Sequence, residues 1–83
     1  IYDIPATARR HFAYQSNQID GPWRSVNATQ LGFYTESFMD ELAAAAGEDP
    51  YQFRRKHLPA GSRHLAALDM VAKRAGWGTP LPE

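Results

Sequence analysis

One stretch of the sequence, residues 27–47, has apolar residues at helical spacing over about five turns. These residues are Leu31, Tyr34, Phe38, Leu42 and Ala45. Their spacing of three and four residues places them on one face of an α-helix. We expect Asn27 to cap this helix, with Gln30 reaching back to the cap as in a capping box. Gly47 is expected to end it in a left-handed conformation, so the pattern predicts a helix over 28–46.

A turn that contains glycine, proline, tryptophan and arginine leads into this helix. It runs from Gly21 to Val26 and carries Trp23 and Arg24 next to the helix start. Backbone N–H groups at a helix N-terminus attract anions, and a nearby arginine strengthens this attraction. The turn therefore predicts an anion site. A plain loop–helix junction, in which Trp23 fills the core, is the alternative that the residues by themselves favour.

Two shorter helices are expected after the long one. Asp49 caps and Pro50 begins a helix that ends at His57, and its basic last turn suits the helix dipole. Ser62 caps a third helix with an apolar face, and Gly76 ends it. The tryptophan after that glycine is expected to fold back on the last turn.

The first part of the chain is expected to be extended. Residues 9–15 alternate weakly in polarity, which predicts a strand, and residues 1–26 form an arm that ends in the Trp-Arg turn. A lone strand needs a partner strand, which this chain barely supplies. We therefore expect a mostly α fold in which the arm or strand precedes three helices within 27–76 and an extended tail covers 77–83. Such a piece is interpreted as a slice of a larger α/β domain.

Composition excludes several kinds of site. The chain has 83 residues, equal numbers of basic and acidic side chains (9 each) and no cysteine, so it supports one small domain without disulfides. The net charge of zero gives no sign of a basic surface that would bind nucleic acid or anionic lipid. No apolar run in the sequence is long enough to span a membrane. The three histidines are not clustered, so no metal site is expected. The chain begins at Ile1, which we interpret as a cut point in a longer polypeptide.

Several separated blocks of the sequence resemble one enzyme family, and their order matches without gaps. The family is that of the molybdenum hydroxylases, which includes xanthine dehydrogenase and aldehyde oxidase. The likeness is to the large molybdopterin-binding subunit, of the bacterial isoquinoline 1-oxidoreductase beta-subunit type. The blocks are Trp23 to Gln30, Glu36, Asp40 to Ala43, Asp49-Pro50, Arg54 to Leu58, and Ala75 to Leu81.

The resemblance implies where the cofactor is held. The family's Phe-Arg-Gly-Phe-Gly turn lies at the molybdenum cofactor, and its arginine falls on Arg24. Its glycines fall on Ser25 and Asn27, while the second aromatic, which packs on aromatic substrate in some members, falls on Val26. Val26 is not aromatic, so the resemblance does not imply that the turn stacks on substrate. The cofactor-binding residues implied in this way are Trp23, Arg24, Ser25, Val26 and Gln30.

The resemblance also implies a reaction and its partners. The family hydroxylates N-heterocycles or oxidises aldehydes, with water as the oxygen source and molybdopterin, here in its cytosine dinucleotide form, as cofactor. The expected partners are the remainder of the large subunit and an iron–sulfur subunit or domain, in the bacterial cytoplasm or periplasm. The catalytic glutamate lies elsewhere in the family, so these residues are not expected to be catalytic by themselves. The alternative is a free-standing small helical interaction module without a catalytic role.

Overall fold

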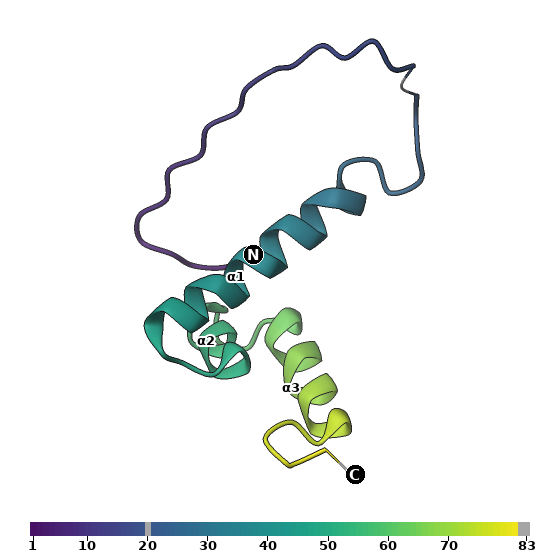
Figure 1. Cartoon of the computed structure of the whole chain (residues 1–83). Coiled ribbons are helices and arrows are strands. Elements are labelled where there is room, and N and C mark those ends of the chain that lie inside the picture. Colours follow the sequence, from purple (N-terminus) through teal and green to yellow (C-terminus); the bar gives the residue numbers. More distant parts are fainter. Residues whose placement is uncertain (20, 82–83) are drawn as a thin grey trace.

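A computed structural model describes residues 1–19 and 21–81 and contains three helices in this part of the chain. They are α1 (Ala28–Ala46), α2 (Pro50–His57) and α3 (Arg63–Ala75). Figure 1 shows α2 lying between the other two helices, beneath the C-terminal end of α1. The mostly helical fold and the bounds expected for the helices are confirmed. None of the helices in these residues is long and apolar enough to cross a membrane.

Side chains cap α2 and α3 as the sequence predicts. The amide of Gln52 donates to Asp49 Oδ1 at 2.9 Å, and Pro50 occupies the first turn of α2. The amide of Leu65 donates to Ser62 Oγ at 3.2 Å, at the start of α3. In both caps the backbone of the capping residue is extended, which is the conformation that lets its side chain reach back to the helix.

Two glycines end the longer helices. Gly47 and Gly76 have φ of 66° and 65°, a left-handed conformation that costs glycine little. At the second of these ends the amide of Trp77 donates to the carbonyl of Ala72 at 2.9 Å. The Trp77 indole N–H donates to Asp49 Oδ2, also at 2.9 Å, so the end of α3 is joined to the cap of α2. The amide of Trp77 therefore bonds back to the last turn of α3 as expected, while packing of its ring on that turn stays a prediction.

The core is small and lies where α2 meets α1 and α3. Met39, Ala43 and Phe53 form its central cluster, and the start of the chain joins it through Tyr2 and Ile4, which are half-buried. The buried apolar residues are Met39, Ala43, Phe53, Leu58 and Ala72. The first residues of the arm are therefore part of the packed region.

The predicted core face of α1 is confirmed at Leu42, which packs against the core cluster, and is wrong at its three earlier residues. Leu31, Tyr34 and Phe38 are 52%, 61% and 58% exposed, whereas the buried residues of α1 are Met39 and Ala43. The reason is geometric, because α2 packs only against the C-terminal half of α1. The N-terminal turns of α1 have no packed neighbour among the described residues, so their apolar side chains face water.

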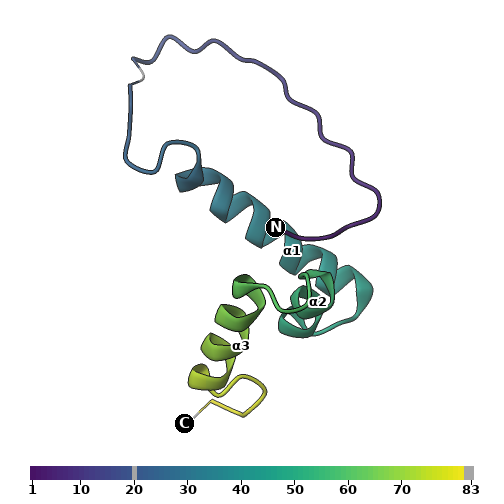
Figure 2. The ribbon, with the colours of Figure 1, turned by 180° about the vertical axis from the view of Figure 1, so that it is seen from behind.

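Of the arm or strand expected at the start of the chain, the structure has the arm: residues 9–15 are not assigned to a strand, and no second strand pairs with them among the described residues. Figures 1 and 2 show the arm leaving the packed helices and returning to the start of α1 after a wide arc. At the other end of the chain, Thr79 forms a turn with Gly76 through an amide-to-carbonyl bond of 3.0 Å. The last part of the expected tail, Pro82 and Glu83, lies outside the described residues.

Candidate functional site

The Trp-Arg turn is an ordered bend held by its own backbone. The amide of Val26 donates to the carbonyl of Trp23 at 3.1 Å, which closes the turn just before α1. The Thr29 hydroxyl reaches back and donates to the carbonyl of Arg24 at 3.0 Å. These bonds fix the direction in which the arm enters the helix, so the turn and the first turn of α1 form one unit.

Two consecutive residues of this turn have a left-handed backbone. Ser25 has φ of 67° and Val26 has φ of 47°, and both carry a Cβ atom that this conformation disfavours. For a β-branched residue the conformation is a true outlier, with a cost on the order of 1–3 kcal/mol. The family resemblance places a glycine at Ser25, and the observed φ is one that glycine adopts readily. Asn27, the other such position, has an ordinary φ of −73°.

The predicted cap of α1 is wrong. Asn27 already has a helical backbone, with ψ of −19°, and its side chain accepts no capping hydrogen bond. A capping residue needs an extended backbone for its side chain to reach the second or third amide of the helix. Within the described residues the amides of Asn27, Thr29 and Gln30 consequently have no hydrogen-bond partner.

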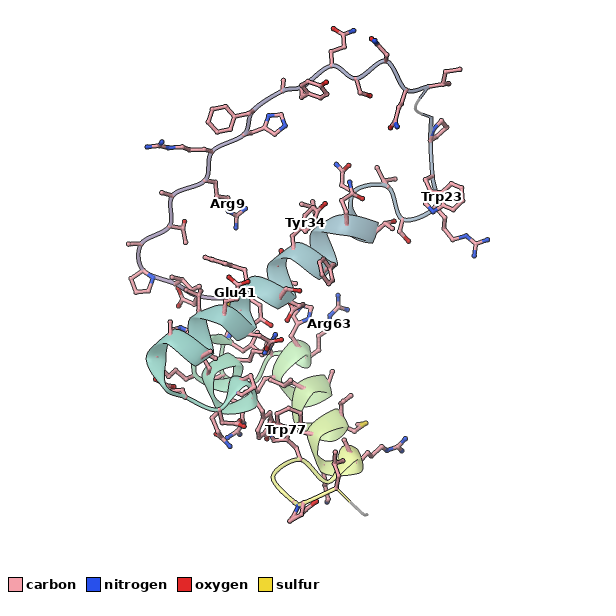
Figure 3. The ribbon with its side chains drawn as sticks, viewed as in Figure 1. Arg9, Trp23, Tyr34, Glu41, Arg63 and Trp77 are labelled. Atoms are coloured by element: carbon pink, nitrogen blue, oxygen red, sulfur yellow. The ribbon has the colours of Figure 1, made fainter. Side chains whose placement is uncertain are left out.

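All five predicted cofactor-binding residues are exposed. Trp23 and Val26 are 77% and 74% exposed, so Trp23 does not fill the core as the alternative interpretation required. Trp23 and Arg24 line a shallow, open hollow. Figure 3 shows Trp23 at the end of the arc, away from α2 and α3. The structure keeps the five residues together at one end of α1, and cofactor binding by them stays a prediction.

The donor set at this end of α1 suits an anion. No carboxylate pairs with Arg24 in the described part of the chain, and the unpaired amides lie at the positive end of the helix dipole. The residues therefore fit a group such as a phosphate, which accepts hydrogen bonds from an arginine and from helix N-terminal amides. Across residues 1–19 and 21–81, no three His, Asp or Glu side chains could together hold a metal ion.

A second polar cluster holds the arm against the helices, and the sequence reasoning missed it. Arg54, on α2, has a side chain only 13% exposed, and its Nε lies 2.9 Å from Glu36 Oε2. Its Nη1 lies 2.6 Å from Asp40 Oδ1, and the Tyr2 hydroxyl donates to Glu36 at 2.9 Å. From the sequence, a solvated helix face is the favoured interpretation for Glu36 and a hydrogen-bond acceptor facing the packed helices is the alternative, and the structure shows the acceptor. The signal in the sequence is the spacing of four residues between Glu36 and Asp40, which places two carboxylates on one face of α1 and offers both to one cation.

Electrostatics agree with a structural role for this cluster. Burial lowers the pKa of the Arg54 guanidinium, but hydrogen bonds and charge from Asp40 and Glu36 outweigh burial and raise the pKa above its usual value. Burial also raises the pKa of the Tyr2 hydroxyl, and the neighbouring Glu36 carboxylate raises it further. Each of the four side chains bonds to another side chain of the cluster, as expected of a structural role.

Fold and site together define a helical segment with an exposed, anion-compatible turn at the start of its longest helix. Two curated proteins match it over 54 residues, which is 65% of the chain. A nicotinate dehydrogenase subunit of Pseudomonas putida is 44% identical, and the beta subunit of isoquinoline 1-oxidoreductase of Brevundimonas diminuta is 33% identical. The matched stretch covers only 4% and 7% of the lengths of these two proteins. No protein-family model and no solved structure matches the chain.

The comparisons support a coarse assignment. The chain is similar to parts of two oxidoreductase subunits, which agrees in part with the family that the sequence blocks resemble. It spans a small fraction of each relative, so the similarity concerns a segment of an enzyme subunit.

Proposed function

We propose that the chain is a segment of the molybdopterin-binding subunit of a molybdenum hydroxylase. The observation that carries this proposal is the 44% identity over 54 residues to a nicotinate dehydrogenase subunit, joined to the order of family-like blocks in the sequence. In this function the whole enzyme hydroxylates an N-heterocycle or oxidises an aldehyde with water as the oxygen source. The segment contributes binding and has no catalytic residue of its own.

The Trp-Arg turn is the proposed contact with the cofactor, molybdopterin in its cytosine dinucleotide form. When bound, this cofactor supplies the redox chemistry of the oxidation. The Arg24 guanidinium supplies charge and hydrogen-bond donors to the anionic part of the cofactor, and the amide of Gln30 adds a donor at the helix start. The left-handed backbone at Ser25 and Val26 forms the bend between Arg24 and the helix start.

The remaining contacts are proposed to come from other parts of the protein. Trp23 and Arg24 line only a shallow hollow, which cannot enclose a large dinucleotide. The rest of the large subunit completes the site, and an iron–sulfur subunit or domain accepts the electrons. The 83-residue chain by itself is expected to bind the cofactor at most weakly.

The test is an Arg24→Ala substitution in the full-length polypeptide, with Arg63→Ala as the control. Both changes remove one exposed arginine, but Arg63 lies at the start of α3, away from the Trp-Arg turn. Loss of one charge-assisted hydrogen bond is worth about 1.5–3 kcal/mol, so cofactor affinity should fall roughly 10- to 100-fold. Molybdenum per polypeptide, measured by mass spectrometry after dialysis, and turnover with an N-heterocycle are the readouts.

Equal metal content and turnover in the Arg24 variant, the Arg63 variant and the parent would remove Arg24 from the site. A full-length polypeptide that contains no molybdopterin would overturn the proposal as a whole. The helical interaction module would then be the better description of the segment.

A further inference from the structure

The arm is anchored firmly at its first residues. The amide of Asp3 donates to the carbonyl of His57 at 2.7 Å, and the side chains of Tyr2 and Ile4 pack against the core cluster. Beyond Pro5 the arm leaves the helices, and both ribbon views show it running free of them. The packed helices therefore fix where the arm starts and in which direction it leaves them. The ribbon views show no helix packed against the residues that follow Pro5.

The backbone of residues 6–15 forms no hydrogen bond with any described part of the chain. Large aromatic side chains are exposed on the same segment, with Phe12 at 84% and Tyr14 at 89%. An extended segment with free amides and carbonyls along its length offers the bonding groups of an unpaired strand. Folded proteins ordinarily pair such groups and cover aromatic side chains of this size.

The sequence of this segment is suited to a strand. Residues 6–19 contain no glycine and no proline, and residues 10–15 alternate between two faces. Arg10, Phe12 and Tyr14 share one face, whereas the other face carries smaller or polar side chains. At about 3.3 Å per residue, the ten residues 6–15 could follow roughly 33 Å of a sheet edge.

Charge indicates what kind of edge would accept the segment. Arg9 and Arg10 lie in it, and residues 6–19 contain no Asp or Glu. A partner strand with carboxylate side chains opposite these arginines would gain from cross-strand ion pairs. Two copies of the arm would bring together only arginines and no carboxylate, so a second copy lacks this complementarity.

We propose that residues 6–15 add as a strand to the open edge of a β-sheet that carries carboxylate side chains in the remainder of the same polypeptide. Main-chain hydrogen bonds supply the attachment, and the face with Phe12 and Tyr14 packs on that polypeptide's apolar surface. The choice of this partner rests on the proposed function, which makes the chain part of a much larger subunit. The strand itself rests on the free backbone, the alternation and the charge of the arm.

Amide hydrogen exchange compares the full-length polypeptide with the 83-residue chain. A strand in the sheet should slow exchange of amides within 6–15 at least about 100-fold in the full-length protein, and the short chain should exchange freely. Thr7→Pro and Ala8→Pro give a matched pair, because successive amides of an edge strand point in opposite directions. One of these two prolines should abolish the protection, and the other should leave it largely intact.

Free exchange of residues 6–15 in the full-length protein would overturn the proposal, and so would equal loss of protection with both prolines. Protection that appears in the 83-residue chain and rises with concentration, together with a dimer in sedimentation, would overturn it in favour of a second copy. Exchange requires no cofactor, so protection in a polypeptide that holds no molybdenum would support the strand while the proposed function fails.

Discussion

Truncation of Phe53 should destabilise the chain far more than the same truncation of Phe38. Phe53 is 7% exposed and belongs to the central cluster with Met39 and Ala43. Its ring also meets the His57 ring edge-on, with centroids 4.7 Å apart at an interplanar angle of 60°. Phe38 is 58% exposed, although it belongs to the apolar face that the sequence pattern assigned to the core.

The two costs can be worked from burial. Replacing a core Phe by Ala typically costs about 3–5 kcal/mol, because a cavity remains after the transfer energy is lost. Burying a whole Phe is worth about 1.5–3 kcal/mol, so the less than half of Phe38 that is covered is worth about 1 kcal/mol or less. A chain of 83 residues has roughly 4–12 kcal/mol of stability in total. Phe53→Ala should therefore remove a large fraction of it.

Urea unfolding of the 83-residue chain, followed by circular dichroism at the helical band, measures both variants. With a slope of about 1 kcal/mol per molar urea for so small a chain, Phe53→Ala should lower the midpoint by roughly 3 M or abolish the transition. Phe38→Ala should lower it by about 1 M or less. Equal shifts, or a larger shift for Phe38, would show that the apolar pattern, not the packing described above, locates the core.

Three further outcomes are expected. Arg54→Ala should lower the free energy of unfolding by about 2 kcal/mol, because charge-assisted hydrogen bonds of a nearly buried guanidinium are lost. Arg9→Ala, in the exposed arm, should change it by less than about 0.5 kcal/mol in the same urea titration. Val26→Gly should stabilise the isolated chain by about 1 kcal/mol, because glycine relieves the left-handed backbone; a destabilised variant would contradict the strain. The pKa of Asp49 is lowered by hydrogen bonds from Gln52 and Trp77, and the pKa of Asp69 is lowered by Arg55. The stability that these groups add is therefore present above about pH 4 and is lost as the pH falls further. A melting temperature that stays level from pH 6 to pH 2 would contradict these pairs.

The helices could be predicted because their signals are local. Asp49-Pro50 and Ser62 begin helices through bonds that span three residues, and Gly47 and Gly76 end them through a backbone conformation that few other residues adopt easily. Such signals operate whatever the rest of the chain does. The cap at Asn27 failed because the preceding left-handed residues deliver a backbone that is already helical, and residue type does not reveal this.

The candidate site could be predicted only in part. A tryptophan and an arginine before a helix are visible in the sequence, and the structure adds the strained backbone and the unpaired amides beside them. The ion pairs of Arg54 with Glu36 and Asp40 depend on how α2 crosses α1, and no local sequence pattern specifies this crossing. Whether the Trp-Arg turn binds a cofactor remains a prediction, to be decided by the metal content of the Arg24 variant.

The difference between apolar pattern and burial in α1 is itself informative. Periodicity predicts which face of a helix is covered in its complete protein, while the structure shows which face these residues cover themselves. The two agree near Leu42, where α2 packs, and disagree at Leu31, Tyr34 and Phe38, whose face of the helix has no packed neighbour among the described residues. The same disagreement occurs in the arm, whose alternating residues have no partner strand among the described residues. Both uncovered surfaces flank the Trp-Arg turn along the chain, so the remainder of the proposed larger subunit is the body expected to cover them. This expectation gives a second test at Phe38. Its truncation to alanine should cost about 1 kcal/mol or less in the short chain, but about 3–5 kcal/mol in the full-length polypeptide if that body is present.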